Sequence, residues 1–111
     1  MKIKTQDHDN FTVVQLDGEF DSEFTELFQD VITETVMKHK VGIVLDMTKV
    51  TFVDSEGLER LLWARDYSSE NNCQLKVVGL EENCKKILEI TRLENEFECY
   101  DKIENVVKSF V

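Results

Sequence analysis

The sequence predicts an α/β domain in which a small mixed, partly parallel sheet, opened by a hairpin, packs with about four helices. Two observations predict this fold class. Segments of strand-like composition alternate with segments whose apolar residues recur at helical spacing, which implies right-handed crossovers between parallel strands. The 111 residues include no proline, four glycines and no repeat, so nothing marks a domain boundary. A chain of this length suits one modest core, and we expect residues 1–111 to form a single domain.

The hairpin is expected from two segments of strand-like composition, Lys2–Asp7 and Phe11–Asp17. The polar residues 8–10 between them are typical of a turn. We expect Gly18 to end the second strand.

A helix is predicted from Ser22, because apolar residues then recur at three- and four-residue spacing on one face. These residues are Phe24, Leu27, Phe28, Val31, Ile32 and Val36. Asp21 or Ser22 is the expected N-cap, since both side chains can accept hydrogen bonds from first-turn N–H groups. The continuous apolar run Val41–Leu45 follows, and it is typical of a strand that is buried on both faces. We therefore place this strand at the centre of the sheet.

A second helix is expected to begin at Ser55 or Glu56 and to end near Asn71–Asn72. Its inward-facing residues are Leu58, Leu61 and Leu62. Leu75–Leu80 is predicted to be a further strand. Two more helices are predicted, each from apolar residues that recur on one helix face. The first is short and carries Ile87, Leu88 and Thr91, and the final one carries Ile103, Val106, Val107 and Phe110.

The charge and hydropathy of the chain limit the classes of partner and the location that we expect for it. The formal net charge is −10, which disfavours nucleic acid and anionic lipid surfaces and suits a basic protein partner. No apolar run reaches the ~20 residues that cross a bilayer, and the first residues lack the apolar core of a signal peptide. We therefore expect a cytoplasmic protein without membrane insertion. The sequence leaves the oligomeric state open.

The number and spacing of the cysteines argue against a domain stabilised by disulfides or by a bound metal. Cys73, Cys84 and Cys99 give an odd number without Cys-x-x-Cys spacing, which argues against both a disulfide framework and a zinc site. We expect reduced, partly buried thiols. The chain also lacks a phosphate-binding loop with Gly-Lys-Ser/Thr. We expect no metal and no cofactor.

The segment Thr51–Leu58 is the candidate functional site, since sites in such sheets lie beyond the carboxyl ends of strands. Ser55 would lie at a helix N-terminus, where unpaired N–H groups and the helix dipole favour an anion. A phosphate there would add about −1.5 to −2 charges, enough to reverse the character of a docking surface. Gly57 in a first helical turn suggests close approach by another chain. The alternative is that Asp54 or Ser55 simply caps the helix, and capping and switching are compatible.

Three stretches of the chain occur in an order typical of one family. They are Leu16–Asp21 with a Gly-Glu-x-Asp turn, Val44–Leu58 with a strand, a loop and an Asp-Ser-x-Gly-Leu helix start, and Leu75–Leu80 followed by a helix at Lys86–Leu93. Over essentially its full length, the chain resembles STAS domains, the fold of the bacterial anti-sigma factor antagonists. The family often has Ser or Thr at the position of Glu56 and a small residue near Glu59, so this helix start is more acidic than usual.

The resemblance implies a function in transcription regulation. In the antagonists, the serine after the motif's Asp is phosphorylated by an anti-sigma factor that is itself a serine kinase. Only the unphosphorylated antagonist binds that kinase and so releases the sigma factor. Position by position, the resemblance makes Ser55 the phosphorylation site, and it places Asp21, Asp54, Glu56 and Gly57 around it on the partner-binding surface.

Two other classes of function remain as alternatives. A constitutive STAS scaffold subunit of a signalling or lipid-transport assembly would use Ser55 only as a cap. An enzyme could use Asp46 after the buried strand, but a haloacid dehalogenase-type phosphatase needs a second Asp where this chain has Thr48. A serine hydrolase would need a nearby base, and His8 and His39 are expected in a turn and at a helix end. We therefore expect a binding protein and not an enzyme.

Overall fold

A computed structural model describes residues 1–110 and shows one five-stranded sheet with the strand order β1-β2-β3-β4-β5. The elements are β1 (Lys2–Asp7), β2 (Phe11–Phe20), α1 (Thr25–Val36), β3 (Gly42–Val53), α2 (Ser55–Glu70), β4 (Gln74–Val78), α3 (Glu82–Ile90), β5 (Glu98–Tyr100) and α4 (Ile103–Lys108). β1 pairs antiparallel with β2, whereas β2, β3, β4 and β5 pair parallel with their neighbours. The predicted mixed α/β class with an opening hairpin is confirmed.

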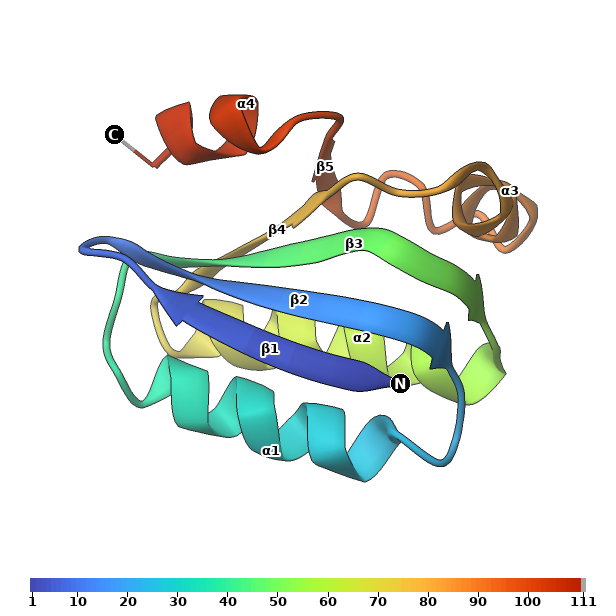
Figure 1. Cartoon of the computed structure of the whole chain (residues 1–111), viewed down its shortest axis with the longest axis horizontal. Helices are drawn as coiled ribbons and strands as arrows, with labels where there is room; N and C mark the ends of the chain where they lie inside the picture. The colour runs from blue at the N-terminus through green and yellow to red at the C-terminus, as the bar shows by residue number, and fades with distance from the viewer. Residues whose placement is uncertain (111) are drawn as a thin grey trace.

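Helices cover both faces of the sheet (Figure 1). α1 and α2 lie under one face, where Phe28 and Ile32 of α1 and Leu61 of α2 join the main core with the inward residues of β2 and β3. α4 lies over the opposite face, where Val106 packs in a smaller cluster with Phe11, Val13, Val44 and Val78. β3 therefore has buried residues on both faces in its first half, as expected for the central strand.

Two strands are longer than predicted. Gly18 was expected to end the second strand, but β2 continues to Phe20, and Gly18 with φ 120° instead marks a register shift in the pairing with β3. The central strand was expected over Val41–Leu45, but β3 continues to Val53. Its later residues pair only with β2. They are therefore not all buried, and the sequence there lacks the continuous apolar run that predicted the first half of the strand.

The start of α1 also differs from the prediction. Neither Asp21 nor Ser22 is its N-cap; the helix begins at Thr25 after Phe24, without a side-chain cap. Asp21 instead organises a preceding turn, in which its carboxylate accepts from the Glu23 N–H at 3.0 Å and its carbonyl accepts from the Phe24 N–H at 3.1 Å. The short edge strand β5 was not predicted, because its three residues are largely exposed and carry no alternating pattern.

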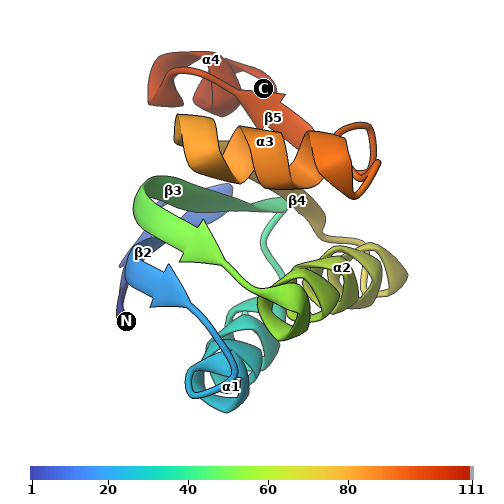
Figure 2. The same ribbon diagram turned by 90° about the vertical axis from the view of Figure 1, so that its right-hand side faces the viewer.

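The parallel pairing fixes where functional residues can gather. β2 and β3 end side by side, with Phe20 in register with Val53, and α1 and α2 both begin directly beyond them. Figure 2 looks toward this end of the molecule, where the two arrowheads lie next to the start of α2. The segment that contains Ser55 therefore meets the loop that contains Asp21 at one edge of the sheet.

Candidate functional site

Asp54 is the N-cap of α2. Its backbone is extended, its carboxylate accepts from the Gly57 N–H at 2.8 Å, and its carbonyl accepts from the Leu58 N–H at 2.9 Å. Of the two cap candidates in the sequence, the structure selects Asp54. Ser55 is the first residue of the helix.

The Ser55 side chain is exposed at the surface. Within residues 1–110 no hydrogen bond engages its hydroxyl, and the N–H groups of Ser55 and Glu56 have no acceptor. These two groups, together with the positive end of a 16-residue helix, provide a favourable electrostatic environment for an anion on Ser55. The hydroxyl is thus accessible and has no structural task.

Gly57 is required by contact within the chain itself. It is buried, and a Cβ at this position would lie 2.6 Å from the Phe20 carbonyl oxygen. The same oxygen accepts from the Asp54 N–H at 3.1 Å. Phe20 thus holds the start of α2 against the end of β2. The close approach that Gly57 suggests is made by Phe20 and not by a second chain.

The five predicted site residues lie at this one edge. Asp21 and Asp54 are half-buried, Ser55 and Glu56 are exposed, and Gly57 is buried. Asp21 directly follows Phe20, whose carbonyl binds the Asp54 N–H, so the two loops that carry these residues are neighbours. That a partner protein binds these residues stays a prediction.

The edge is strongly acidic. The segments 17–26 and 50–59 contain no Lys or Arg and carry Asp17, Glu19, Asp21, Glu23, Glu26, Asp54, Glu56 and Glu59. The ion pairs within residues 1–110 use other carboxylates, those of Asp7, Asp66, Glu96, Glu98 and Asp101. Sequence reasoning treated Glu59 only as a departure from the family and did not include Glu19 or Glu23. The strand pairing brings Glu19 to this edge.

Residues that could suggest catalysis are not arranged for it. Asp46 lies inside β3 and does not end the strand; its carboxylate accepts from the Thr48 N–H at 3.0 Å and from the Thr48 hydroxyl at 2.6 Å. His8 and His39 are exposed and precede β2 and β3, at the sheet edge opposite Ser55. Neither histidine can serve Ser55 as a base. Among residues 1–110 no group of three or more His, Cys, Asp or Glu is placed to hold a metal.

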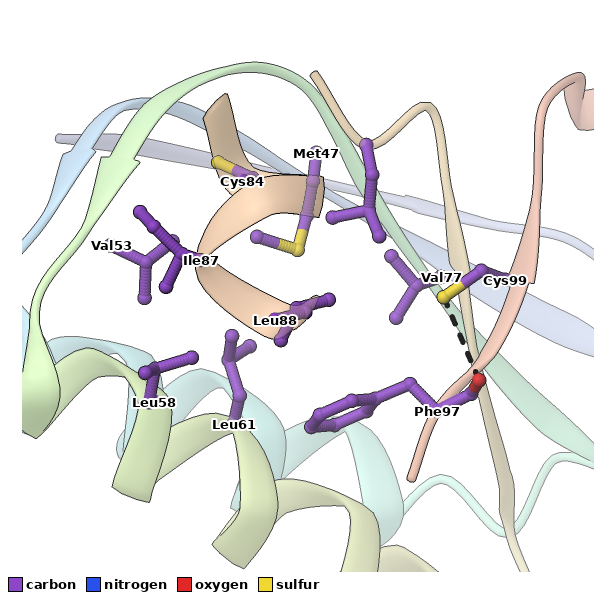
Figure 3. Close-up of a pocket in the computed structure, with 11 residues that line it drawn as sticks. Met47, Val53, Leu58, Leu61, Val77, Cys84, Ile87, Leu88, Phe97 and Cys99 are labelled. Atoms are coloured by element: carbon purple, nitrogen blue, oxygen red, sulfur yellow. Dashed lines mark hydrogen bonds between the residues drawn. The ribbon is translucent and has the colours of Figure 1, made fainter. Parts of the chain in front are cut away.

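An apolar cavity lies in the core between α2 and α3 (Figure 3). Its lining residues are Met47, Val53, Leu58, Leu61, Val77, Leu80, Cys84, Ile87, Leu88, Phe97 and Cys99. With about 10 Å³ it has room for one water-sized sphere and offers no charged side chain to a ligand. Burial, followed by the nearby Glu81, raises the pKa of the Cys84 thiol to about 11. This thiol is therefore inert near neutral pH.

No helix formed by residues 1–110 combines the length and apolar character that crossing a membrane requires.

The three cysteines are free, with Cys73 and Cys84 buried and Cys99 exposed.

Comparison with known proteins finds relatives that cover most of the chain. The chain is 29% identical over 84 residues to a STAS-domain containing protein of Pseudomonas aeruginosa, covering 76% of this chain and 82% of that protein. It is 24% identical over 95 residues to the anti-sigma-B factor antagonist of Staphylococcus aureus, covering 86% and 88%.

Solved structures share the fold at low sequence identity. An anti-sigma factor antagonist from Mycobacterium paratuberculosis superposes with a TM-score of 0.86 at 22% identity, covering 98% of this chain and 92% of that one. SpoIIAA of Bacillus in its phosphorylated form gives a TM-score of 0.73 at 14% identity, covering 97% and 99%. The family model for the STAS domain matches residues 2–106. The chain belongs to the STAS domain family.

Proposed function

We propose that this protein is a phosphorylation-controlled interaction module of the anti-sigma factor antagonist type. In its unphosphorylated form it binds an anti-sigma factor that is also a serine kinase, and this binding releases a sigma factor. Phosphorylation of Ser55 ends the interaction. The protein acts by binding and not by catalysis, and the proposed partnership places it in the cytoplasm.

The observation that carries this proposal is the division of tasks at the start of α2. Asp54 caps the helix, so the Ser55 hydroxyl is exposed and unused by the fold. A serine that acted as the cap could not be phosphorylated without loss of a hydrogen bond that stabilises the helix. Here a phosphate can be added while the cap stays intact, and the helix N-terminus favours its charge.

The relatives support the same reading. Proteins named anti-sigma-B factor antagonist match 86% of the chain, and a protein of this fold has been solved in a phosphorylated form. The predicted neighbours Asp21, Asp54 and Glu56 surround Ser55 on the proposed docking surface. Gly57 is buried, so we assign it an indirect part: it lets α2 begin close enough to Phe20 for this surface to form.

A phosphate on Ser55 would act on the partner and not on the fold. The surrounding carboxylates already form an acidic surface that suits a basic partner, and a neutral hydroxyl at its centre can be covered by that partner. About two further negative charges and three acceptor oxygens at this point would have to be desolvated on docking. We therefore expect the phosphorylated form to be excluded sterically and by desolvation, despite the overall charge complementarity.

The test compares what the wild-type chain and the Ser55→Asp variant retain from lysate of the native cells, identified by mass spectrometry. Ser55→Ala is the matched control, because it removes the hydroxyl without adding charge. Circular dichroism and thermal unfolding check that all three proteins are folded.

We expect the wild type and Ser55→Ala to retain a kinase-like anti-sigma factor, and Ser55→Asp to lose it. Equal retention by all three proteins would contradict the switch, and a stable complex of fixed stoichiometry would then favour a constitutive scaffold.

A further inference from the structure

Phe52 is an exposed aromatic residue that neither the core nor the chemistry of the site explains. Its side chain is 47% exposed, whereas its neighbour Val53 is 4% exposed and packs in the main core. Phe52 therefore points to the opposite face of the sheet. On that face α4 packs with Phe11, Val13, Val44 and Val78, and Phe52 is outside this cluster.

The position of Phe52 connects it to the candidate site. It is in register with Glu19 of β2, and it precedes Asp54 and Ser55 by two and three residues. Figures 1 and 2 show this end of β3 running into the start of α2. α3 lies beside this half of the strand, where the Cys84 thiol donates to the Val50 carbonyl, and Phe52 is not among the residues of either core cluster. The exposed ring and the exposed Ser55 hydroxyl thus belong to the same edge of the molecule.

The charges around Phe52 define the partner. Glu19 lies beside it in register on β2, Asp54 and Glu56 follow it in the chain, and none of the carboxylates of segments 17–26 and 50–59 takes part in an ion pair within residues 1–110. The nearest basic side chains in sequence are Lys49, at the register position of Asp17, and Arg60, which binds Gln29. Burying an aromatic residue next to unpaired carboxylates is favourable only if the partner supplies cations around an apolar pocket.

We infer that Phe52 is the apolar anchor of the docking surface, and that it fits a protein whose binding site is an apolar pocket rimmed by Lys and Arg. The inference rests on the proposed function and names the residue that gives the interaction its affinity, whereas Ser55 controls it. Aromatic residues at the centre of interfaces commonly dominate binding energy, while charged rims set orientation and rate.

The test uses the full chain with the photo-reactive residue p-benzoylphenylalanine in place of Phe52, Glu56 or Met37, expressed and irradiated in the native cells. Met37 is the matched control, because it is 68% exposed and lies at the far end of α1. Mass spectrometry identifies the cross-linked peptides. The cross-linked protein is then purified, and its affinity for Phe52→Ser and Met37→Ser is compared with that for the wild type.

We expect positions 52 and 56 to cross-link to one protein, with the Phe52 adduct in a peptide that combines apolar residues with Lys or Arg. Phe52→Ser should weaken binding roughly 30-fold or more, as loss of an anchor residue does, and Met37→Ser should not change it. An adduct at Glu56 without one at Phe52 overturns the inference and leaves the proposed function standing. An adduct at Phe52 that persists equally in a Ser55→Asp background supports the anchor and contradicts the switch. No adduct at Phe52, or one in an acidic peptide, overturns the inference.

Discussion

At the scale of single residues, the start of α2 assigns different tasks to adjacent side chains. Asp54 satisfies the Gly57 N–H, Ser55 remains exposed, and Gly57 allows the backbone to approach Phe20. The sequence identified Asp54 and Ser55 as cap candidates, since both are favoured types. The sequence could not distinguish the two caps, because the helix could begin at Ser55 or one residue later.

Removal of the cap should destabilise the protein without touching Ser55. We expect Asp54→Ala to lower the free energy of unfolding by about 1 kcal/mol, since an unsatisfied first-turn N–H loses its acceptor. Asp54→Asn should retain most of the stability. Urea unfolding followed by circular dichroism measures both. A loss of the same size in Ser55→Ala would show that Ser55 shares the capping task.

Gly57 should be intolerant of even one methyl group. A Cβ 2.6 Å from the Phe20 oxygen forces α2 away from β2, and overpacking of this kind costs about 1–3 kcal/mol. This cost exceeds the gain of up to ~1 kcal/mol in helix propensity from Gly to Ala. Thermal unfolding of Gly57→Ala should show a lower Tm. Glu59→Ala, an exposed change on the next turn, should leave it nearly unaltered, and a stabilised Gly57→Ala would contradict the contact.

At the scale of elements, the short helix α4 is held over the outer sheet face by a buried lysine. The Lys76 ammonium forms an ion pair with Glu98 of β5 at 2.8 Å and donates to the Ser109 hydroxyl at 2.8 Å. It also lies 4.6 Å from the centre of the Phe110 ring. A helix of six residues is unstable alone, so these contacts and its apolar face hold it in place.

This arrangement predicts a pH-dependent contribution to stability. The hydrogen bond from Lys76, followed by that from Tyr100, lowers the pKa of Glu98 below its ordinary value. A carboxyl group with a lowered pKa in the folded state stabilises the protein above its unfolded pKa, and the contribution is lost as pH falls through the folded pKa.

We therefore expect Glu98→Gln to cost about 1 kcal/mol near pH 7, a value reduced by solvent screening because the Glu98 side chain is 55% exposed. The cost should decrease as the pH is lowered toward 3, because the wild-type carboxyl begins to be protonated as the pH approaches its lowered pKa. Urea unfolding at both pH values measures it, with Glu104→Gln on α4 as the control. An equal cost at both pH values would contradict the role of the charge.

Elements with a strong periodic pattern could be predicted from the sequence, and elements defined by long-range pairing could not. α1 and α2 were predicted because their apolar faces repeat over several turns. The second half of β3 was missed because its buried residues, Val50 and Val53, are separated by pairs of exposed ones. β5 was missed because its three residues are largely exposed, and pairing with a neighbouring strand orders both segments. In the same way, the sequence singled out Ser55 but not Phe52, whose exposure depends on which parts of the sheet the helices leave uncovered.

At the scale of the whole molecule, the charges are unevenly distributed. Most ion pairs lie away from the carboxyl ends of β2 and β3, whereas the carboxylates at that edge are unpaired within residues 1–110. A net charge of −10 with one unpaired acidic edge should direct basic partners to that edge.

Association with the proposed partner should therefore depend strongly on salt. We expect the association rate constant to fall about tenfold between low and high ionic strength, while dissociation changes little. Stopped-flow fluorescence across a salt series measures this. Glu56→Gln should flatten the dependence, and Glu104→Gln on α4 should not. A rate independent of salt would contradict electrostatic steering by this edge.

The central claim is that Ser55 is the residue on which the partner acts. The most direct measurement incubates the unphosphorylated chain with the captured partner and ATP, and follows both phosphopeptides by mass spectrometry and complex formation by light scattering. The account predicts one phosphate, on Ser55, and dissociation of the complex as it accumulates, with neither in Ser55→Ala. A phosphate on another residue, or a complex that survives full phosphorylation of Ser55, would contradict it.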